Sequence, residues 1–351
     1  MSRLSGERRM REVSPRPTPS GPQISPGEHK QPRDQSTPGE AFQPTIQELL
    51  QTGDPDLIRE PLEDWLERHT QSQQAGLAIA AWLDCSGEQA LVRSAIERWL
   101  DRYRLSPGAQ PLLKAWLDAG GELDLVREPV RCWLLTHGRS TQASFVLKAW
   151  LDAGGELDLV REQLSMWLQT HGRASIAVFV YRAWLVASGE LDFVRETAER
   201  WLHQHAREEE AQYLLKAWLD AGGELDRVRG PLSEWLAEHA GRPSAGFVYA
   251  AWIKAGGEIE LLSERCLQWL QKYASNEEQT LFVLDAWLAR GGELDPILPA
   301  LRVWLAEYAT DRKASAVYER WLECDGEPGM LAEAMERWLE LHATTPKAAF
   351  L

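Results

Sequence analysis

The sequence is poor in cysteine and contains no long hydrophobic run. Its four cysteines lie far apart and form no CxxC pair, so neither a disulfide framework nor a zinc site is indicated. No segment approaches the roughly 18 apolar residues that are needed to span a bilayer. The N-terminus also lacks the apolar core of a secretory signal. These absences predict a cytoplasmic protein that does not enter the membrane.

Catalytic motifs and an excess of positive charge are lacking as well. The chain contains no GxSxG, GxGxxG, P-loop, HExxH or EF-hand loop, and we therefore expect no enzyme activity, no cofactor and no metal. Residues 44–351 carry 31 Lys and Arg against 48 Asp and Glu, a net charge of −17. Because nucleic-acid affinity depends on Lys and Arg displacing counterions, this balance argues against a nucleic-acid partner and favours a basic or mixed-charge protein partner.

Tryptophan, in contrast, is abundant and evenly spaced. All seventeen recur every 17 residues, apart from one step of 18 between Trp269 and Trp287. Such a constant period is typical of repeat architectures. Two helices with Trp alternate in the repeat. The A helix stops at a Gly pair, as at Gly154-Gly155, and the B helix that follows has one apolar stripe and one polar side.

The sequence thus predicts an all-α, right-handed α-solenoid of about nine two-helix repeats of 34 residues, with a Trp-rich core. We assign this solenoid to residues 44–343. Residues 1–43 are rich in Pro and have no apolar periodicity, which predicts a disordered arm. The first repeat carries Glu48 in place of an A-helix Trp, as a terminal capping repeat requires. Residues 344–351 begin a truncated further copy, which predicts self-association through the C-terminal edge.

The tryptophans are predicted to be structural, because they stand beside Leu inside apolar stripes. This core assignment includes Trp116, Trp133, Trp150, Trp167, Trp184, Trp201, Trp218 and Trp235. Six histidines also recur, four residues after a B-helix Trp, but Tyr103, Tyr273 and Tyr308 occupy the same column. Since Tyr does not replace His in an ordinary zinc site, we expect these rings to pack on the Trp and to cap the helix. Asp158 and its equivalents are expected to be N-caps of the B helices.

The period of this helix-turn-helix unit resembles that of the tetratricopeptide class of α-solenoids, over residues 45–342. The resemblance implies a concave groove that binds peptides or protein surfaces. Within the constant framework, the position two residues before the A-helix Trp changes from basic to acidic along the chain. A position that varies inside a constant framework is a good candidate for partner contact. The candidates are Lys114, Lys148, Arg182, Lys216, Asp285 and Glu319.

These features predict a non-enzymatic scaffold that binds protein or peptide segments along the groove of a helical repeat. Two alternatives are open. One is an RNA-binding helical repeat of the kind that reads one base per repeat. The other is a recognition arm of a larger signalling assembly. An enzyme on a helical-repeat frame would require a cleft residue that does not repeat, and the sequence shows none.

Overall fold

The structure is a computed structural model that describes residues 54–343, apart from residues 189, 292 and 325. The chain divides into two units, Met1–Pro44 and Thr45–Leu351, and the described residues belong to the second. They contain seventeen α-helices, one 3₁₀ helix and no strand. The arm predicted over residues 1–43, the capping position Glu48 and the truncated copy at residues 344–351 lie outside the described residues.

Two kinds of helix alternate along the described chain. The A helices are α3 (Gln73–Asp84), α5 (Ala109–Asp118), α7 (Ala143–Asp152), α9 (Ala177–Ser188), α11 (Ala211–Asp220), α13 (Ala245–Lys254), α15 (Glu277–Ala289) and α17 (Ala314–Glu323). The B helices are α2 (Pro55–His69), α4 (Gln89–Tyr103), α6 (Leu123–His137), α8 (Leu157–His171), α10 (Leu191–His205), α12 (Leu225–His239), α14 (Ser263–Tyr273), α16 (Leu298–Tyr308) and α18 (Pro328–His342), with η1 (Asp295–Ile297) just before α16. None of these helices is long and apolar enough to cross a bilayer.

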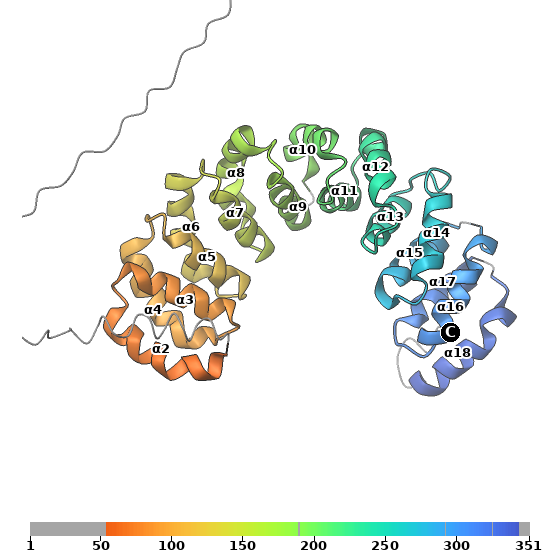
Figure 1. The fold of residues 1–351 in the computed structure, drawn as a ribbon, viewed down its shortest axis with the longest axis horizontal. Coiled ribbons are helices and arrows are strands. Elements are labelled where there is room, and N and C mark those ends of the chain that lie inside the picture. Colours follow the sequence, from red (N-terminus) through yellow and green to blue (C-terminus); the bar gives the residue numbers. More distant parts are fainter. Residues whose placement is uncertain (1–53, 189, 292, 325, 344–351) are drawn as a thin grey trace, which may run out of the picture. The chain divides into compact units, whose positions relative to one another are not determined.

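The A helices form one layer and the B helices form the other. Consecutive A helices contact one another from α3 to α17, and each A helix also contacts the B helix that follows it. Contacts between successive B helices are less extensive. Figure 1 shows this alternation from α5 to α13, with the helices following one another in chain order. The fold is an all-α solenoid, in which each repeat buries its apolar side against its neighbours.

A Gly pair follows five of the eight A helices, and its two residues are there for separate reasons. The first Gly takes the left-handed conformation, with φ +76° at Gly154, which closes the helix without a Cβ clash. The second Gly lies against the A-helix Trp, and a Cβ added to Gly155 would overlap the Trp150 indole. Ser86 replaces the first Gly in one repeat and keeps a positive φ of 62°. Only the second position is therefore closed to larger side chains by packing.

The prediction that Asp158 caps α8 is wrong. The N-cap residue is Glu156, the helix begins at Leu157, and no side chain caps it. Asp158 lies in the first turn, where its negative charge faces the positive end of the helix dipole. It also pairs with Arg161 at 3.7 Å. A carboxylate suits both the cap and the first turn, so the residue type does not decide between the two positions.

All seventeen Trp side chains are buried, with none more than 3% exposed. In the A helices the indole N–H donates to the carbonyl six residues later, as from Trp150 to Glu156 at 3.1 Å. In most B helices it donates to the turn of the preceding repeat, as from Trp167 to Ser140 at 2.9 Å. The A-helix Trp therefore bonds within its own repeat, and the B-helix Trp bonds to the preceding one.

Glutamates that follow the A helices form ion pairs with arginines of the preceding B helix, and these pairs join neighbouring repeats. Glu122 pairs with Arg93 of the preceding B helix at 2.9 Å. Six such pairs, each 29 residues apart, form a ladder: Arg59–Glu88, Arg93–Glu122, Arg127–Glu156, Arg161–Glu190, Arg195–Glu224 and Arg229–Glu258. The ladder ends where Ser263 replaces the next arginine, and α14 begins only at that residue.

The A helices are not buried on all sides, although apolar residues nearly surround them. The B layer covers one side, and the neighbouring A helices cover the two flanks. The remaining side is open, since Phe145 is 41% exposed and Tyr213 is 43% exposed. This open side positions the candidate functional site.

Candidate functional site

The open side of the A helices carries three columns of side chains, which we call the open face. They lie five residues before, two residues before and two residues after the A-helix Trp. These positions share one side of a helix because they are three or four residues apart. The first column is Leu77, Pro111, Phe145, Phe179, Tyr213, Phe247, Phe282 and Ala316; the second is Ala80, Lys114, Lys148, Arg182, Lys216, Ala250, Asp285 and Glu319; the third is Asp84, Asp118, Asp152, Val186, Asp220, Lys254, Ala289 and Glu323.

Aromatic rings fill the middle of the first column, over α7 to α15. They do not form an unbroken stack. Phe179 and Tyr213 lie with their ring centroids 5.8 Å apart, and Phe247 and Phe282 lie 5.9 Å apart. The described residues show no ring contact between Phe145 and Phe179, or between Tyr213 and Phe247. The column therefore has two gaps between neighbouring rings.

Each gap in the aromatic column contains an apolar hollow. The first has a volume of about 300 Å³ and is lined by Phe145, Ile176 and Phe179 together with residues of α5 and α7. The second has a volume of about 450 Å³ and is lined by Tyr213 and Phe247 together with residues of α9 and α13. Concave, mostly apolar sites with a few polar groups at their edges are the usual form of a binding site.

The six partner-contact candidates all lie in the second column of the open face. Three of its cations are already paired within their own helix, with the aspartate one turn later. These pairs are Lys114–Asp118, Lys148–Asp152 and Lys216–Asp220. Exposed pairs of this kind contribute little to stability. Their main effect is that a partner meets a neutral pair at these places instead of a free cation.

Arg182 is the exception among these cations. The residue one turn later is Val186 instead of an aspartate, and the described residues supply no hydrogen bond or ion pair to the Arg182 guanidinium. Both side chains line the second hollow, and Val186 is 67% exposed. The open face thus has one uncompensated positive charge, and it lies beside an apolar surface.

Toward the C-terminal repeats, the second column becomes acidic. Asp285 pairs with Lys254 of the preceding A helix at 3.1 Å and with Arg320 of the following one at 3.5 Å. Glu319 is half-buried in α17. The structure therefore places the six candidates on one face, but it distinguishes the paired lysines, the unpaired Arg182 and the compensated Asp285.

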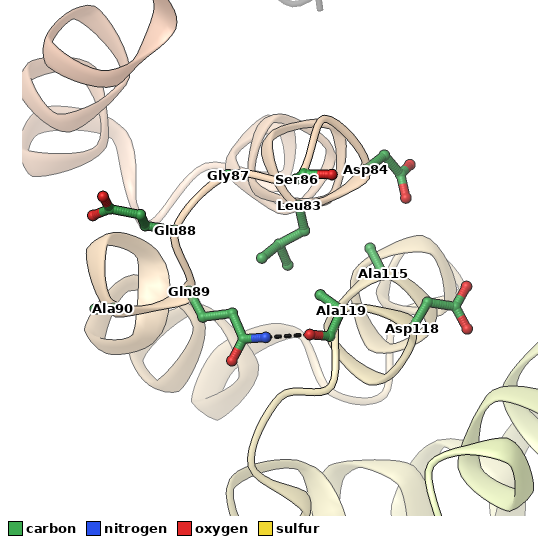
Figure 2. A pocket seen from close by; sticks show the side chains of 10 residues that line it. All are labelled: Leu83, Asp84, Ser86, Gly87, Glu88, Gln89, Ala90, Ala115, Asp118 and Ala119. Carbon is green, nitrogen blue, oxygen red and sulfur yellow. Dashed lines mark hydrogen bonds between the residues drawn. The ribbon is translucent and has the colours of Figure 1, made fainter. Parts of the chain in front are cut away.

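A further hollow of about 640 Å³ lies between the α3–α4 turn and α5. Figure 2 shows Glu88 pointing outward on one side of the hollow and Asp84 and Asp118 on the other, while Gln89 reaches across to the Ala119 carbonyl. Acid-base catalysis requires carboxylates that converge on one reacting atom. This hollow does not bring its carboxylates together.

The histidine column joins repeats. Within residues 54–343, apart from the three undescribed positions, no group of three or more His, Cys, Asp or Glu side chains could hold a metal ion. The His171 ring lies 5.2 Å from that of Trp167, as the sequence predicts. Its Nε2 lies 2.8 Å from the Arg139 carbonyl of the preceding repeat. Tyr273 donates its hydroxyl to Gly241 in the same way, at 2.9 Å. The capping prediction is wrong for His171, whose bond goes to the preceding repeat, but it is confirmed for His69, whose Nδ1 lies 3.0 Å from the Trp65 carbonyl of its own helix.

The cysteines whose pKa is perturbed are not activated for nucleophilic chemistry. Burial raises the pKa of the Cys266 thiol to about 12. Burial and a hydrogen bond to Glu128 also raise the pKa of Cys132. Since the thiolate is the nucleophilic form, both shifts disfavour the reactive species near neutral pH.

Comparison of the chain with protein-family models, with curated proteins and with solved structures gives no match. The open face is therefore the feature on which a functional assignment rests.

The residues that sequence reasoning alone misses are those of the aromatic column. A planar residue stands five positions before the A-helix Trp in five consecutive repeats: Phe145, Phe179, Tyr213, Phe247 and Phe282. The signal is therefore present in the sequence. Helical periodicity, however, does not show whether a further layer covers the A helices. The same residues are therefore equally compatible with a buried core.

Proposed function

We propose that this protein is a non-enzymatic interaction scaffold that binds segments of other proteins along its open face. The observation that carries the proposal is the row of partly exposed aromatic rings from Phe145 to Phe282. A contiguous apolar patch on a folded surface marks an interaction site, because its burial by a partner is favourable. The large exposed residues Leu135 and Leu341, in contrast, stand singly on B helices.

The charge pattern favours a protein segment over a nucleic acid. Cations beside exposed rings would also suit single-stranded RNA, which stacks its bases on aromatic side chains. Three of the four cations from Lys114 to Lys216 are nevertheless neutralised by their own aspartates. The whole chain carries a net charge of −15, which repels a phosphate backbone. A recognition arm of a larger signalling assembly would use the same face in the same way.

Affinity capture with the full chain tests the proposal. The test variant is Phe145→Ser with Tyr213→Ser, which removes two exposed rings of the open face. The matched control is Leu135→Ser, which removes an exposed apolar side chain of 58% exposure from the B layer. We expect the wild type and the control to retain a common set of proteins that the test variant loses. Identical sets for all three chains would contradict binding through the open face.

A gel shift at low salt tests the RNA alternative. The probe is a mixed-sequence single-stranded RNA, and the comparison is again between wild type and the Phe145→Ser, Tyr213→Ser chain. A retarded band that disappears in this variant would favour RNA over protein as the ligand of the open face. We expect no such band, because the acidic chain repels the probe.

Two further properties belong to the proposal. We place the protein in the cytoplasm because all four of its cysteines are free thiols, which suits a reducing compartment. We also propose self-association near the C-terminal edge, where Leu341 of α18 is 66% exposed. Light scattering of the full chain over a range of concentrations tests this second property. A constant monomer mass, unchanged by Leu341→Ser, would contradict it.

A further inference from the structure

We infer that the open face binds an extended segment of a partner protein that carries two apolar anchor side chains with an acidic side chain between them. The anchors occupy the two hollows of the aromatic column, and the carboxylate pairs with Arg182. This inference rests on the proposed function and specifies the chemistry of the partner.

The positions of the two hollows set the spacing of the anchors. The first is lined by α5, α7 and α9, and the second by α9, α11 and α13. Their centres are therefore two A helices apart. Neighbouring packed helices are about 8 to 10 Å apart, so the two hollows lie about 16 to 20 Å from each other. An extended chain advances about 3.3 Å per residue and covers this distance in about six residues.

The lining of the hollows favours apolar anchors. Phe145, Ile176 and Phe179 surround the first hollow, and Tyr213 and Phe247 flank the second. The rings that touch each other, Phe179 and Tyr213, form the ridge between the two hollows. An inserted aromatic or branched aliphatic side chain would contact ring faces and remove them from water. The ridge would lie under the residues between the anchors.

The charges of the face favour an acidic residue between the anchors. Arg182 lies on α9, the helix that lines both hollows, and Lys148 and Lys216 on either side of it are paired with their own aspartates. Its charge alone lacks a partner in this central part of the face, because Val186 stands where the aspartate would be. A guanidinium forms a strong, often bidentate pair with a carboxylate, and a nearby apolar surface strengthens such a pair.

The experiment uses the full chain and four fluorescein-labelled synthetic peptides in a Ser-Gly background. The reference peptide has two phenylalanines about six residues apart and a glutamate two residues from one of them, so that all three side chains project from the same side of the extended chain. In the second peptide the glutamate is replaced by lysine. In the third, both phenylalanines are replaced by serine. In the fourth, the two phenylalanines are adjacent. Fluorescence anisotropy gives the Kd for each peptide.

Two protein variants address Arg182 independently. Arg182→Glu reverses its charge. Val186→Asp leaves the arginine in place but supplies the aspartate that pairs with a lysine in three other repeats, at an exposed position where folding is not at risk. Arg98→Glu on α4 is the control, because Arg98 is exposed, belongs to the B layer and, among the described residues, bonds only to the Ser94 carbonyl of its own helix. Circular dichroism of each variant monitors folding.

We expect the reference peptide to bind about ten-fold more tightly than each of the other three peptides. Val186→Asp and Arg182→Glu should each weaken its binding, the latter by about ten-fold, and Arg98→Glu should leave it unchanged. The lysine peptide should bind Arg182→Glu more tightly than it binds wild type. Such a reversal of peptide preference would show that the effect comes from the pair between residue 182 and the peptide side chain, and not from other consequences of the substitution.

Equal binding of the glutamate and lysine peptides, with no effect of Arg182→Glu or Val186→Asp, would overturn the inference. So would equal binding of the peptides with spaced and adjacent phenylalanines. If none of the peptides binds while protein capture still depends on Phe145 and Tyr213, the proposed function stands and the inference is wrong. If capture does not depend on these residues either, both are wrong.

Discussion

The indole N–H of Trp167 donates to the backbone carbonyl of Ser140, 27 residues earlier, over 2.9 Å. The acceptor lies in the turn between α6, the B helix of the preceding repeat, and α7. Trp150, on that A helix, donates instead to the Glu156 carbonyl at the start of the next B helix. Two buried tryptophans 17 residues apart thus have different partners, one at the start of the next B helix and one in the turn before the A helix.

Replacing Trp167 by Phe should weaken the contact between repeats. The change removes the indole donor and loses this hydrogen bond, which costs about 1 kcal/mol, since the Ser140 carbonyl still accepts from the Ala143 N–H. Trp150→Phe is the matched control, because it loses the equivalent bond within the A-to-B turn. Urea unfolding should show a lower midpoint for both. Amide exchange should show lost protection around Ser140 in the first variant only, and equal protection there in both would contradict the assignment.

Replacing Gly155 by Ala should destabilise the protein more than replacing Gly154 by Ala. At Gly155 the new methyl group overlaps the Trp150 ring, and overpacking of this kind costs about 1 to 3 kcal/mol. At Gly154 there is open space, and the cost is that of a left-handed conformation, about 1 kcal/mol. Ser86 shows that a side chain can occupy this position. Thermal unfolding measures both variants, and the reverse order would contradict the packing argument.

The Arg93–Glu122 pair should make the stability depend on acidity. Hydrogen bonds from Arg93 and its positive charge hold the pKa of Glu122 below its usual 4.5. A carboxyl group whose pKa is lowered by folding stabilises the fold above its unfolded pKa, and this contribution is lost as the pH falls through its folded pKa. We therefore expect Glu122→Gln to lower the urea midpoint near neutral pH and to differ progressively less from wild type below about pH 4.5.

Glu293 provides the control for this titration. It is equivalent to Glu122, but Ser263 stands where the arginine of the preceding repeat would be. The effect of Glu293→Gln on the urea midpoint should therefore vary less with pH. If both variants show the same dependence on pH, the pairing with Arg93 is not its cause. Because the pair is exposed, added salt should also reduce the effect of Glu122→Gln.

His171 should be replaceable by Tyr but not by Leu. A tyrosine hydroxyl makes the same bond to the preceding repeat in the case of Tyr273 and Gly241, and both rings pack on the B-helix Trp. His171→Tyr should change the unfolding free energy by less than about 0.5 kcal/mol, whereas His171→Leu loses the bond and should cost about 1 kcal/mol. Urea unfolding distinguishes the two. A large loss with Tyr would indicate a role for the imidazole beyond packing and bonding.

Much of the fold follows from the sequence because its signals are local and repeated. The Trp period predicts the number and alternation of the helices, and the Gly pair predicts where five of the A helices stop. The stacking of His171 on Trp167 follows from their spacing of four residues on one helix. The role of Asp158 does not, since a carboxylate is favourable both at the cap and in the first turn, and only the helix start at Leu157 distinguishes them.

The candidate site is less accessible to sequence reasoning. The position of Arg182 in a varying column is visible in the sequence, and so is Val186 four residues later. That Arg182 has no ion pair depends on distances to other helices, which spacing along one chain does not give. Asp285 illustrates the opposite case, because its partners Lys254 and Arg320 come from two neighbouring A helices.

By itself, then, the sequence determines that this chain is a two-helix repeat with tryptophan in its core, because a period of 17 residues repeats the same local chemistry many times. Only the tertiary structure decides which side of the A helix is left open. The apolar residues nearly surround that helix in sequence, and burial depends on how many layers pack around it. With two layers in the described chain, one side has no covering helix, and the rings of Phe145 and Tyr213 are partly exposed there.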